Sequence, residues 1–341
     1  GNAVPPMGKF LDPRSGFWQN AEAVNGSTEE ISLDLNGLTD EVQIVFDEQQ
    51  VPHLFAENNS DLYMAQGYVV AMMRLWQMEF QTHAAAGRLT ELIGAGKNEA
   101  VLNFDRGQRR KGMVFGARNT LTEMYKDEQI ATYLEAYASG VNQYIESLSY
   151  KDLPLEYKLL DYRPETWTTL KSALILEYMI DNLAGWDNDI ENTNALSLFG
   201  GKEFNFLFPE WLDGIDPVIP TDSTWGFDPI ATETPKDSAV LIQISHVLPK
   251  PDPDNGSNNR AVPGNKTKSG KPRLTNDTHL GLNLPSLWVM MQLHGPDVNV
   301  FGYTFTGALG ITICHNERSA WGFTNGPRDT KDWYKITFKD N

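Results

Sequence analysis

The pentapeptide Asn255-Gly256-Ser257-Asn258-Asn259 marks the point where a helix-rich sequence gives way to a strand-rich one. Pro251, Pro253 and Asp254 precede it, so it follows a spacer of turn-forming residues. Alone, Asn-Gly is typical of a tight turn, in which the next serine has only a local role. The position of Ser257 at the boundary between two unlike regions gives it more weight than the dipeptide does.

The sequence before this point begins with a predicted hairpin and a long helix. Residues 42–47 and 51–56 alternate like strands, with Pro52 at a tolerated edge position. Ser60 then suits a helix N-cap. An apolar stripe at spacings of three and four over residues 62–80 predicts a helix with one face in a core.

Further helices are predicted at about residues 120–149 and 170–183, whereas the sequence after residue 264 is typical of β-strands. The predicted strands cover residues 271–274, 287–293, 298–305, 309–314, 320–324 and 333–338. This order, helices first and strands later, indicates an α+β fold.

Composition excludes several classes of function. The 341 residues include 28 basic and 45 acidic side chains, a net charge of −17 that argues against nucleic acid as a partner. A single cysteine, Cys314, allows no internal disulfide. No stretch approaches the roughly 18 apolar residues of a transmembrane helix, so we expect none.

Both ends suggest that the sequence belongs to a longer product. It begins at Gly1 without the basic-then-apolar pattern of a signal peptide, as expected if a leader has been removed. It ends three residues after the last predicted strand. We therefore expect a truncation at the C-terminus.

Short motifs spread over most of the chain resemble the penicillin acylase family of N-terminal nucleophile hydrolases. Each is weak alone, but their order and density from about residue 40 onward match the family's pattern. The motifs are Val51-Pro52-His53, Ala65-Gln66-Gly67-Tyr68, Arg74-Leu75-Trp76-Gln77-Met78, Ala86-Gly87-Arg88-Leu89-Thr90-Glu91, Gly140-Val141-Asn142, Pro164-Glu165-Thr166-Trp167-Thr168, Gly256-Ser257-Asn258-Asn259, Ser269-Gly270-Lys271-Pro272, Asn276-Asp277-Thr278-His279-Leu280 and Trp321-Gly322-Phe323-Thr324-Asn325.

The resemblance implies an αββα-type sandwich, here incomplete, with a helix-rich α-chain region before the catalytic strands. It divides the chain into an irregular arm (1–40), the helix-rich region (41–224), a spacer peptide (225–256) and the start of a β chain (257–341).

By the same resemblance, the precursor cuts itself between Gly256 and Ser257. The new N-terminal Ser257 then supplies a hydroxyl nucleophile and an α-amine base. An α-amine has a pKa of about 7.7–8.0, so a useful fraction is unprotonated near neutral pH. Gly256 suits the cut because a residue without Cβ reaches the strained backbone that the attack requires.

Two more residues are implied near the nucleophile. His279, which is 22 residues after Ser257, matches a family position that carries Gln or His beside the serine. Asn325 matches the residue whose backbone N–H is one oxyanion donor, so its side chain is free to vary. The second donor, an Asn side chain, and an Arg that orients it would lie beyond Asn341. On sequence alone, a loop histidine that only makes local hydrogen bonds remains the alternative for His279.

A structural Ca²⁺ site is also implied by the resemblance. Asp329, Asp332 and the carbonyl of Lys331 would bind the ion together with Asp189, which stands where many relatives have Glu. Carboxylate and carbonyl oxygens are the ligands that Ca²⁺ takes. Without the resemblance, Asp329 and Asp332 are typical of solvated surface charge. No organic cofactor is implied.

The acyl pocket is expected to be lined by Met179, Leu183, Leu280 and Ile313. Apolar residues at such spacings are usually core, and only the family match assigns these four to a pocket. Leu183 and Leu280 replace aromatic residues of phenylacetyl-specific enzymes, which favours an aliphatic acyl group.

The sequence thus predicts a self-processing amidohydrolase, periplasmic or otherwise exported, that cleaves a linear N-acyl compound such as a β-lactam side chain or an acyl-homoserine lactone. Its partners would be this small substrate and its own α and β chains. The alternative is a non-catalytic, calcium-stabilised binding or scaffold protein with the same fold. The retained Gly256-Ser257, Asn276 and His279 weigh against it.

Overall fold

The structure is a computed structural model that describes residues 7–20, 29–185, 188–209, 254–326 and 330–334, and single residues at 214, 224, 226, 336 and 339. It forms two compact units, one of residues 1–185 and 251–328 and the other of residues 186–250 and 329–341. The second unit contains α9 (Asp189–Phe199) and α10 (Gly201–Leu207).

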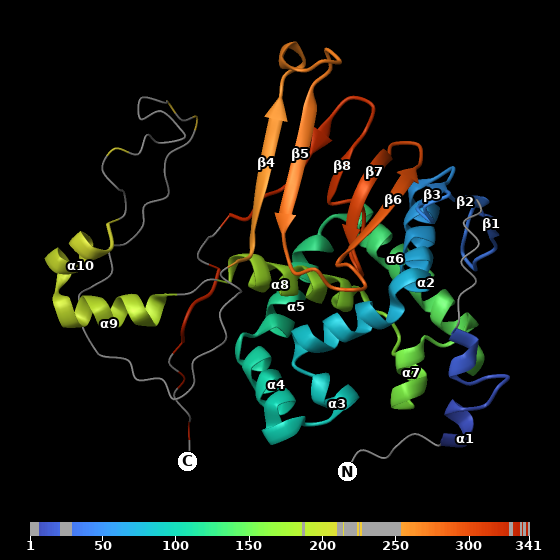
Figure 1. Cartoon of the computed structure of the whole chain (residues 1–341), viewed down its shortest axis with the longest axis horizontal. Helices are drawn as coiled ribbons and strands as arrows, with labels where there is room; N and C mark the ends of the chain where they lie inside the picture. Colours follow the sequence, from blue (N-terminus) through green and yellow to red (C-terminus); the bar gives the residue numbers. More distant parts are fainter. Residues whose placement is uncertain are drawn as a thin grey trace. The chain divides into compact units, whose positions relative to one another are not determined.

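The described α-helices of the first unit all come from the region before the spacer (Figure 1). They are α1 (Met7–Phe10), α2 (Asn59–Ala86), α3 (Leu89–Ile93), α4 (Ala100–Arg110), α5 (Met113–Met124), α6 (Glu128–Ser147), α7 (Leu155–Leu160) and α8 (Thr169–Ala184).

The strands form two sheets. The larger has the order β1-β2-β3-β6-β7-β8-β9 and the smaller is the hairpin β4-β5. Their bounds are β1 (Glu29–Leu33), β2 (Val42–Phe46), β3 (Pro52–Phe55), β4 (Gly256–Val262), β5 (Arg273–His279), β6 (Trp288–His294), β7 (Asn299–Phe305), β8 (Ile313–His315) and β9 (Ala320–Trp321). All pairs are antiparallel except β3 and β6, where His53 lies opposite Gln292. The larger sheet therefore joins strands from both sides of Ser257. Mixed helix and sheet content confirms the α+β class.

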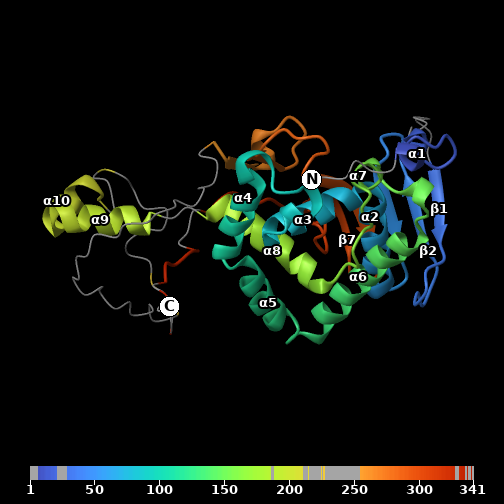
Figure 2. The same cartoon turned by 90° about the horizontal axis from the view of Figure 1, so that it is seen from below.

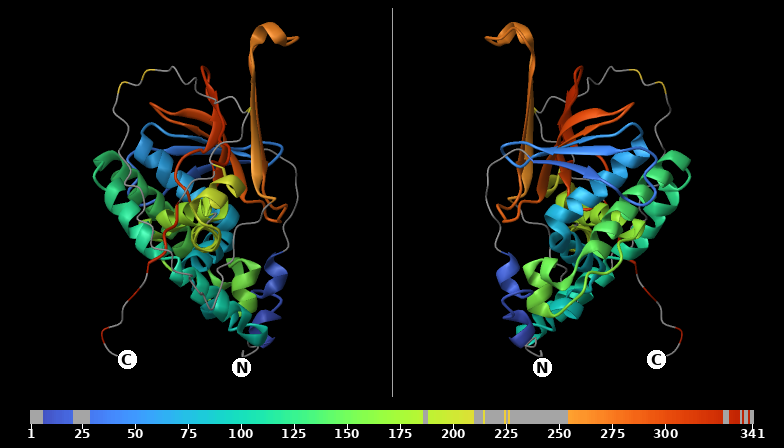
Figure 3. Two further views of the ribbon diagram at one scale, coloured as in Figure 1. Left: turned by 90° about the vertical axis from the view of Figure 1, so that its left-hand side faces the viewer. Right: turned by 90° about the vertical axis from the view of Figure 1, so that its right-hand side faces the viewer.

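The main core lies between one face of the larger sheet and helices α2 and α6. Six inward side chains of β2, β3 and β6 are at most 1% exposed, namely Val42, Ile44, Leu54, Val289, Met291 and Leu293. They pack against the apolar stripe of α2 and against Tyr137 and Val141 of α6. Figures 2 and 3 show these helices gathered beside the sheet, while the hairpin β4-β5 stands apart from it.

Two glycines let α2 and α6 touch along their backbones. A Cβ on Gly67 would lie 2.1 Å from the carbonyl oxygen of Tyr137, and a Cβ on Gly140 would lie 1.9 Å from that of Met64. No side chain fits at either position. Gly140 costs some helix propensity, but it makes this close packing possible.

Several predicted boundaries change. The long helix is capped by Asn58, whose side chain accepts the N–H of Asp61 at 2.9 Å, rather than by Ser60. Pro52 is the first residue of an interior strand, not an edge position. It is tolerated because β6 pairs only from His53 onward. The predicted helix over 120–149 is the end of α5 followed by α6.

Other predictions concern the ends of the chain. The arm over 1–40 is not wholly irregular, because it contains α1, a 3-10 helix at Phe17–Asn20 and β1, which pairs with β2. Residues 333, 334 and 336 are not in a strand. Nearly all of the spacer over 225–256 lies outside the described residues.

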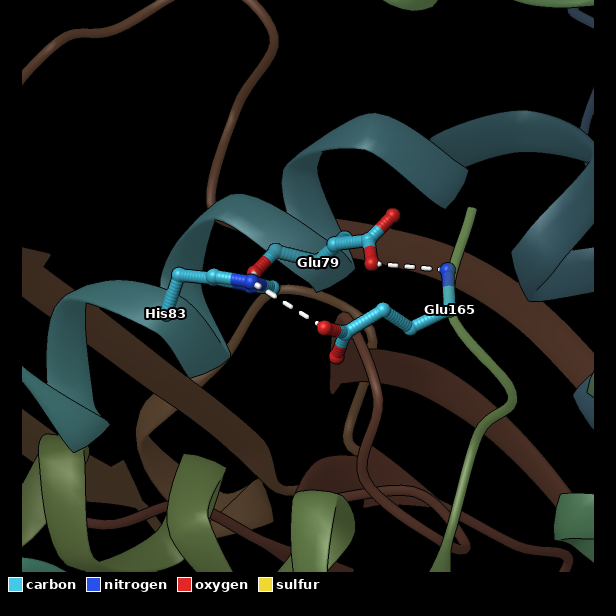
Figure 4. Close-up of side chains that lie close together, drawn as sticks. All are labelled: Glu79, His83 and Glu165. Carbon is cyan, nitrogen blue, oxygen red and sulfur yellow. Dashed lines mark hydrogen bonds and ion pairs between the residues drawn. The ribbon is translucent and has the colours of Figure 1, made fainter. Parts of the chain in front are cut away.

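A buried carboxylate holds the helices together away from the sheet. Glu79 of α2 is 2% exposed; its oxygens accept the Tyr157 hydroxyl at 2.5 Å and the backbone N–H of Glu165 at 2.9 Å. Burial raises the pKa of Glu79. One turn later, His83 donates from Nδ1 to the backbone carbonyl oxygen of Glu79 at 2.9 Å, and its Nε2 faces Glu165 at 3.8 Å (Figure 4).

Two cations complete this arrangement. Arg88 forms a two-pronged pair with Glu165, with its nitrogens 2.7 and 3.2 Å from the carboxylate oxygens. Lys171 of α8 lies 3.1 Å from Glu165 and 3.9 Å from Glu79. The hydrogen bonds from Arg88 lower the pKa of Glu165 to about 2. We refer to Glu79, His83 and Glu165 as the Glu79 cluster.

The close backbone contacts at Gly67 and Gly140 predict that a larger residue at either position strongly destabilises the protein. Gly140→Ala should lower the free energy of unfolding by about 3 kcal/mol or more, above the usual 1–3 kcal/mol of overpacking, because the clash is with backbone. Gly201→Ala is the matched control, since a Cβ there meets nothing within 4 Å. Urea unfolding of both variants measures the difference, and equal effects would contradict the close-packing explanation.

The pairing of Glu165 predicts a dependence of stability on pH. The folded-state pKa of about 2 lies below the ordinary glutamate pKa of 4.5, so the pair stabilises the protein above pH 4.5. That contribution is lost as the pH falls from 4.5 to 2. Because Glu165 is 32% exposed, we expect Glu165→Gln to cost about 1–2 kcal/mol at pH 7.

The control is Glu123→Gln, which removes a pair on the surface with Lys126 that is 68% exposed. Urea unfolding at pH 7 and pH 3 should show that the difference in free energy of unfolding between the parent and Glu165→Gln is smaller at pH 3. An equal difference in free energy of unfolding at both pH values would mean that the charge of the Glu165 carboxylate is not the source of the stabilisation.

Candidate active site

Ser257 is the second residue of β4, at the base of the β4-β5 hairpin. It lies opposite Thr278 of β5. Its hydroxyl oxygen accepts the backbone N–H of Asn325 at 2.7 Å. Two residues that are 68 positions apart, the expected nucleophile and the expected oxyanion donor, are thus in direct contact.

Two asparagine side chains fix the segment that carries Asn325. Asn259 and Asn276 face each other across the hairpin, on the same face as Ser257. Asn259 donates to the carbonyl of Gly322 at 2.9 Å, and Asn276 donates to that of Phe323 at 3.0 Å. A Cβ on Gly322 would lie 2.1 Å from the Asn276 side chain. Both asparagines occur in the motifs quoted above, but the motifs alone assign neither a role.

A pocket of about 260 Å³ opens beside Ser257. All four residues expected in the acyl pocket, Met179, Leu183, Leu280 and Ile313, line it. Leu176, Met179, Ile180 and Leu183 lie on one face of α8, at the three- and four-residue spacings of a helix. None of the described residues that line the pocket is charged.

The pocket also has an aromatic wall that the sequence analysis missed. Trp288 of β6 and Phe305 of β7 are direct cross-strand neighbours, and their rings stack with centroids 4.4 Å apart. Phe323 lines the pocket as well. Trp288 and Phe305 are in predicted strands, but only the pairing of β6 with β7 brings their rings together.

His279, which the resemblance implies beside Ser257, makes no hydrogen bond with the Ser257 hydroxyl among the described residues. His279 pairs with Gly256, and successive residues of a strand point to opposite faces, so its ring lies on the other face of the hairpin. There its Nε2 is 3.1 Å from Asp277 and 3.3 Å from Asn258. The ring nitrogen Nδ1 lies 3.3 Å from where a Cβ on residue 256 would be.

The expected calcium ligands fall in the second unit. Asp189 begins α9, Lys331 and Asp332 are described without helix or strand, and Asp329 lies outside the described residues. The ligand set that the sequence predicts therefore stays a prediction.

Among the described residues, the Glu79 cluster brings together three side chains of types that can bind a metal ion. One potential ligand atom from each lies within 4.8 Å of the other two. Lys171 and Arg88 already neutralise its two carboxylates. A divalent cation would have to displace or face these two positive charges. The cluster is better explained as a buried ion-pair network.

Comparisons with known proteins identify the family of the chain. The family model described as penicillin amidase matches residues 41–341. The chain is 28% identical to the acyl-homoserine lactone acylase QuiP of Pseudomonas aeruginosa, over 88% of this chain and 35% of the relative. It is also 28% identical to a penicillin acylase 2 proenzyme of a Pseudomonas species, over 91% of this chain and 39% of the relative.

A solved penicillin G acylase from Alcaligenes faecalis aligns with 54% of this chain and 97% of its own, at 27% identity and a TM-score of 0.43. The chain spans little more than a third of the length of the two curated relatives. No helix in the described part of the chain is both long and apolar enough to cross a membrane. Since the family model covers all but the first forty residues, the chain belongs to the penicillin amidase family.

Proposed function

We propose that this chain is part of a self-processing amidohydrolase that uses Ser257 to cleave a linear N-acyl compound. One observation carries the proposal: the Ser257 hydroxyl lies at an uncharged apolar pocket and accepts the Asn325 N–H at 2.7 Å. A nucleophile, a hydrogen-bond donor and a place for an acyl group are the parts that acyl transfer needs. The names of the acylase relatives support the same reaction class.

The first step of the proposal is a cut in the chain itself. The Ser257 hydroxyl attacks the carbonyl carbon of Gly256 and the peptide C–N bond breaks, so that the Gly256 acyl group is transferred to oxygen and the amine of Ser257 is freed. Water then hydrolyses this ester and releases the Gly256 carboxylate. Until then, the Ser257 nitrogen is an amide and cannot act as a base.

Amide hydrolysis follows by the same hydroxyl. The free α-amine takes the hydroxyl proton as Ser257 attacks the substrate carbonyl, and the proton goes to the leaving amine. Water then hydrolyses the acyl-enzyme ester. The Asn325 N–H is proposed to stabilise the oxyanion that forms in both steps, a contribution typically of about 3 kcal/mol for one positioned donor.

The pocket limits the acyl group that we propose. Burying a charge without a partner is costly, so a lining without charged groups favours a neutral acyl chain over one that ends in a carboxylate. Leu183 and Leu280, which stand where phenylacetyl-specific enzymes have aromatic residues, favour an aliphatic acyl group. An N-acyl homoserine lactone or a β-lactam with an apolar side chain meets this requirement.

His279 enters the proposal through the peptide that is cut. Its ring lies against Gly256 on the face opposite the hydroxyl, so any side chain at position 256 would crowd it. We assign it to holding the cleavage site, together with Asp277 and Asn258. The protein is proposed to be periplasmic or otherwise exported, as the family resemblance implies.

Ser257→Ala should abolish both the cut and amide hydrolysis, because one hydroxyl performs both attacks. Ser257→Cys should still allow some cutting but turn over amides poorly. The control is Ser269→Ala, in the loop between β4 and β5. The measurements are N-terminal sequencing and hydrolysis of N-acyl amides of graded length with the full-length protein.

In this experiment a new N-terminus at Ser257 supports the enzyme. An uncut chain without turnover supports the alternative, a scaffold protein of the same fold. Normal hydrolysis by the Ser257→Ala protein would remove the central claim. Equal rates for aliphatic and carboxylate-ended acyl groups would remove the claim about the pocket.

The calcium site is proposed to be structural, with Asp189, Asp329, Asp332 and the Lys331 carbonyl as ligands. Asp329→Ala combined with Asp332→Ala should then lower the melting temperature or slow the cut, while kcat of processed protein stays near that of the parent. Elemental analysis and thermal unfolding with and without a chelator test this. A processed protein that contains no calcium and ignores the chelator would contradict it.

A further inference from the structure

A second cavity lies where helix α2 bends. The backbone of Arg74 leaves the helical region there, with φ −145° and ψ 18°, and Figure 1 shows the two halves of α2 at an angle. The cavity has a volume of about 850 Å³. This is within the range of ligand sites, about 300–1,000 Å³. We call it the Arg74 cavity.

The guanidinium of Arg74 has no partner in the described part of the chain. Its Nε is buried and makes no hydrogen bond, and no carboxylate of the described residues lies within ion-pair distance. Burial lowers the pKa of Arg74. In a protein with 45 acidic and 28 basic side chains, a partly buried cation without an acid is unexpected. A buried charge without a partner indicates a site for an anion.

The neighbouring side chains define what else the ligand must contain. Met72, Met73, Trp76 and Phe80 line the cavity and offer apolar surface. Gln77 lines it too; its Nε2 donates to the carbonyl of Ser286 at 3.0 Å, which leaves Oε1 buried without a partner. The lining thus combines one cation, an apolar part formed by these four side chains, and further polar side chains such as Gln19, Asn20 and Asn283.

Two acids in the same lining limit the charge of the ligand. Asp152 and Glu156 line the cavity, and neither is paired with Arg74. Asp152 accepts the hydroxyl of Ser149 at 2.5 Å. These carboxylates would repel a second negative charge, so a ligand with one charge is favoured over a dianion.

We propose that the Arg74 cavity binds a small apolar monocarboxylate, such as a short-chain fatty acid. The carboxylate would accept from the guanidinium, and the hydrocarbon would pack on the methionine and aromatic side chains. This goes beyond the amidase activity, because the site is separate from the Ser257 pocket and takes a charged group that the Ser257 pocket does not favour.

The two sites share structural elements. Tyr178 of α8 lines the Arg74 cavity, whereas the next residue, Met179, lines the Ser257 pocket. The segment after β5 contributes Asn283, Leu284 and Pro285 to the cavity and Leu280 to the pocket. A ligand in the cavity would therefore contact the elements that shape the acyl pocket.

The test compares hexanoate with 1-hexanol by isothermal titration calorimetry on the full-length protein. Hexanoate should bind, and Arg74→Gln should weaken it by about 10-fold to 100-fold, as expected for loss of a charge-assisted hydrogen bond. Hexanol should bind at least tenfold more weakly than hexanoate to the parent. Arg106→Gln is the matched control, since Arg106 is 53% exposed on the surface.

Thermal unfolding provides a second measurement. If Arg74 has no anionic partner in the free protein, Arg74→Gln should leave the melting temperature without ligand unchanged or raise it. The same substitution should remove the increase in melting temperature that hexanoate produces. A lower melting temperature with no hexanoate binding would mean that a carboxylate of the protein itself occupies the site, which overturns the proposal. Equal hexanoate affinity in the parent and Arg74→Gln would overturn it as well.

Discussion

The buried carboxylate of Glu79 is the interaction on which the helical half of the molecule depends. A carboxyl group that is 2% exposed needs partners, and it finds them on three separate segments: Tyr157 of α7, the backbone of Glu165 and, more distantly, Lys171 of α8. Removing any one partner weakens the hydrogen bonding or ion pairing of a buried carboxyl oxygen, an acceptor that water cannot easily reach. The path of the chain from α7 to α8 is therefore determined by one side chain of α2.

This constraint reaches the candidate site because α8 supplies one wall of the Ser257 pocket. Lys171 is in the first turn of α8 and Leu183 is in its last. The other wall is determined independently, by Asn259 and Asn276, which tie the hairpin to the segment that carries Asn325. The site thus forms where two parts of the fold meet, each positioned by polar contacts outside the pocket.

The spacing of apolar residues along the sequence predicted several helices and strands of the fold. The stripe of α2, the helix from Thr169 and the hairpin of β2 and β3 follow from spacing, which depends on near neighbours only. The pocket residues and the approach of Asn325 to Ser257 came from family resemblance. The face of His279 could not be predicted, because it depends on the pairing register of β4 and β5. The Glu79 cluster could not be predicted for a related reason. Glu165 lies 86 residues after Glu79 in the sequence, and the two meet only in the folded chain.

The parallel pairing of β3 with β6 joins residues 239 positions apart, such as His53 and Gln292. A break at residue 256 would leave one continuous sheet made of two polypeptides. Folding would then change from a unimolecular to a bimolecular process, and stability would depend on concentration. An intact chain pays the cost of closing this long loop once, before the break. The uncut form would act as the template for assembly, and the separated pieces would each expose an unpaired strand edge, a hazard for aggregation.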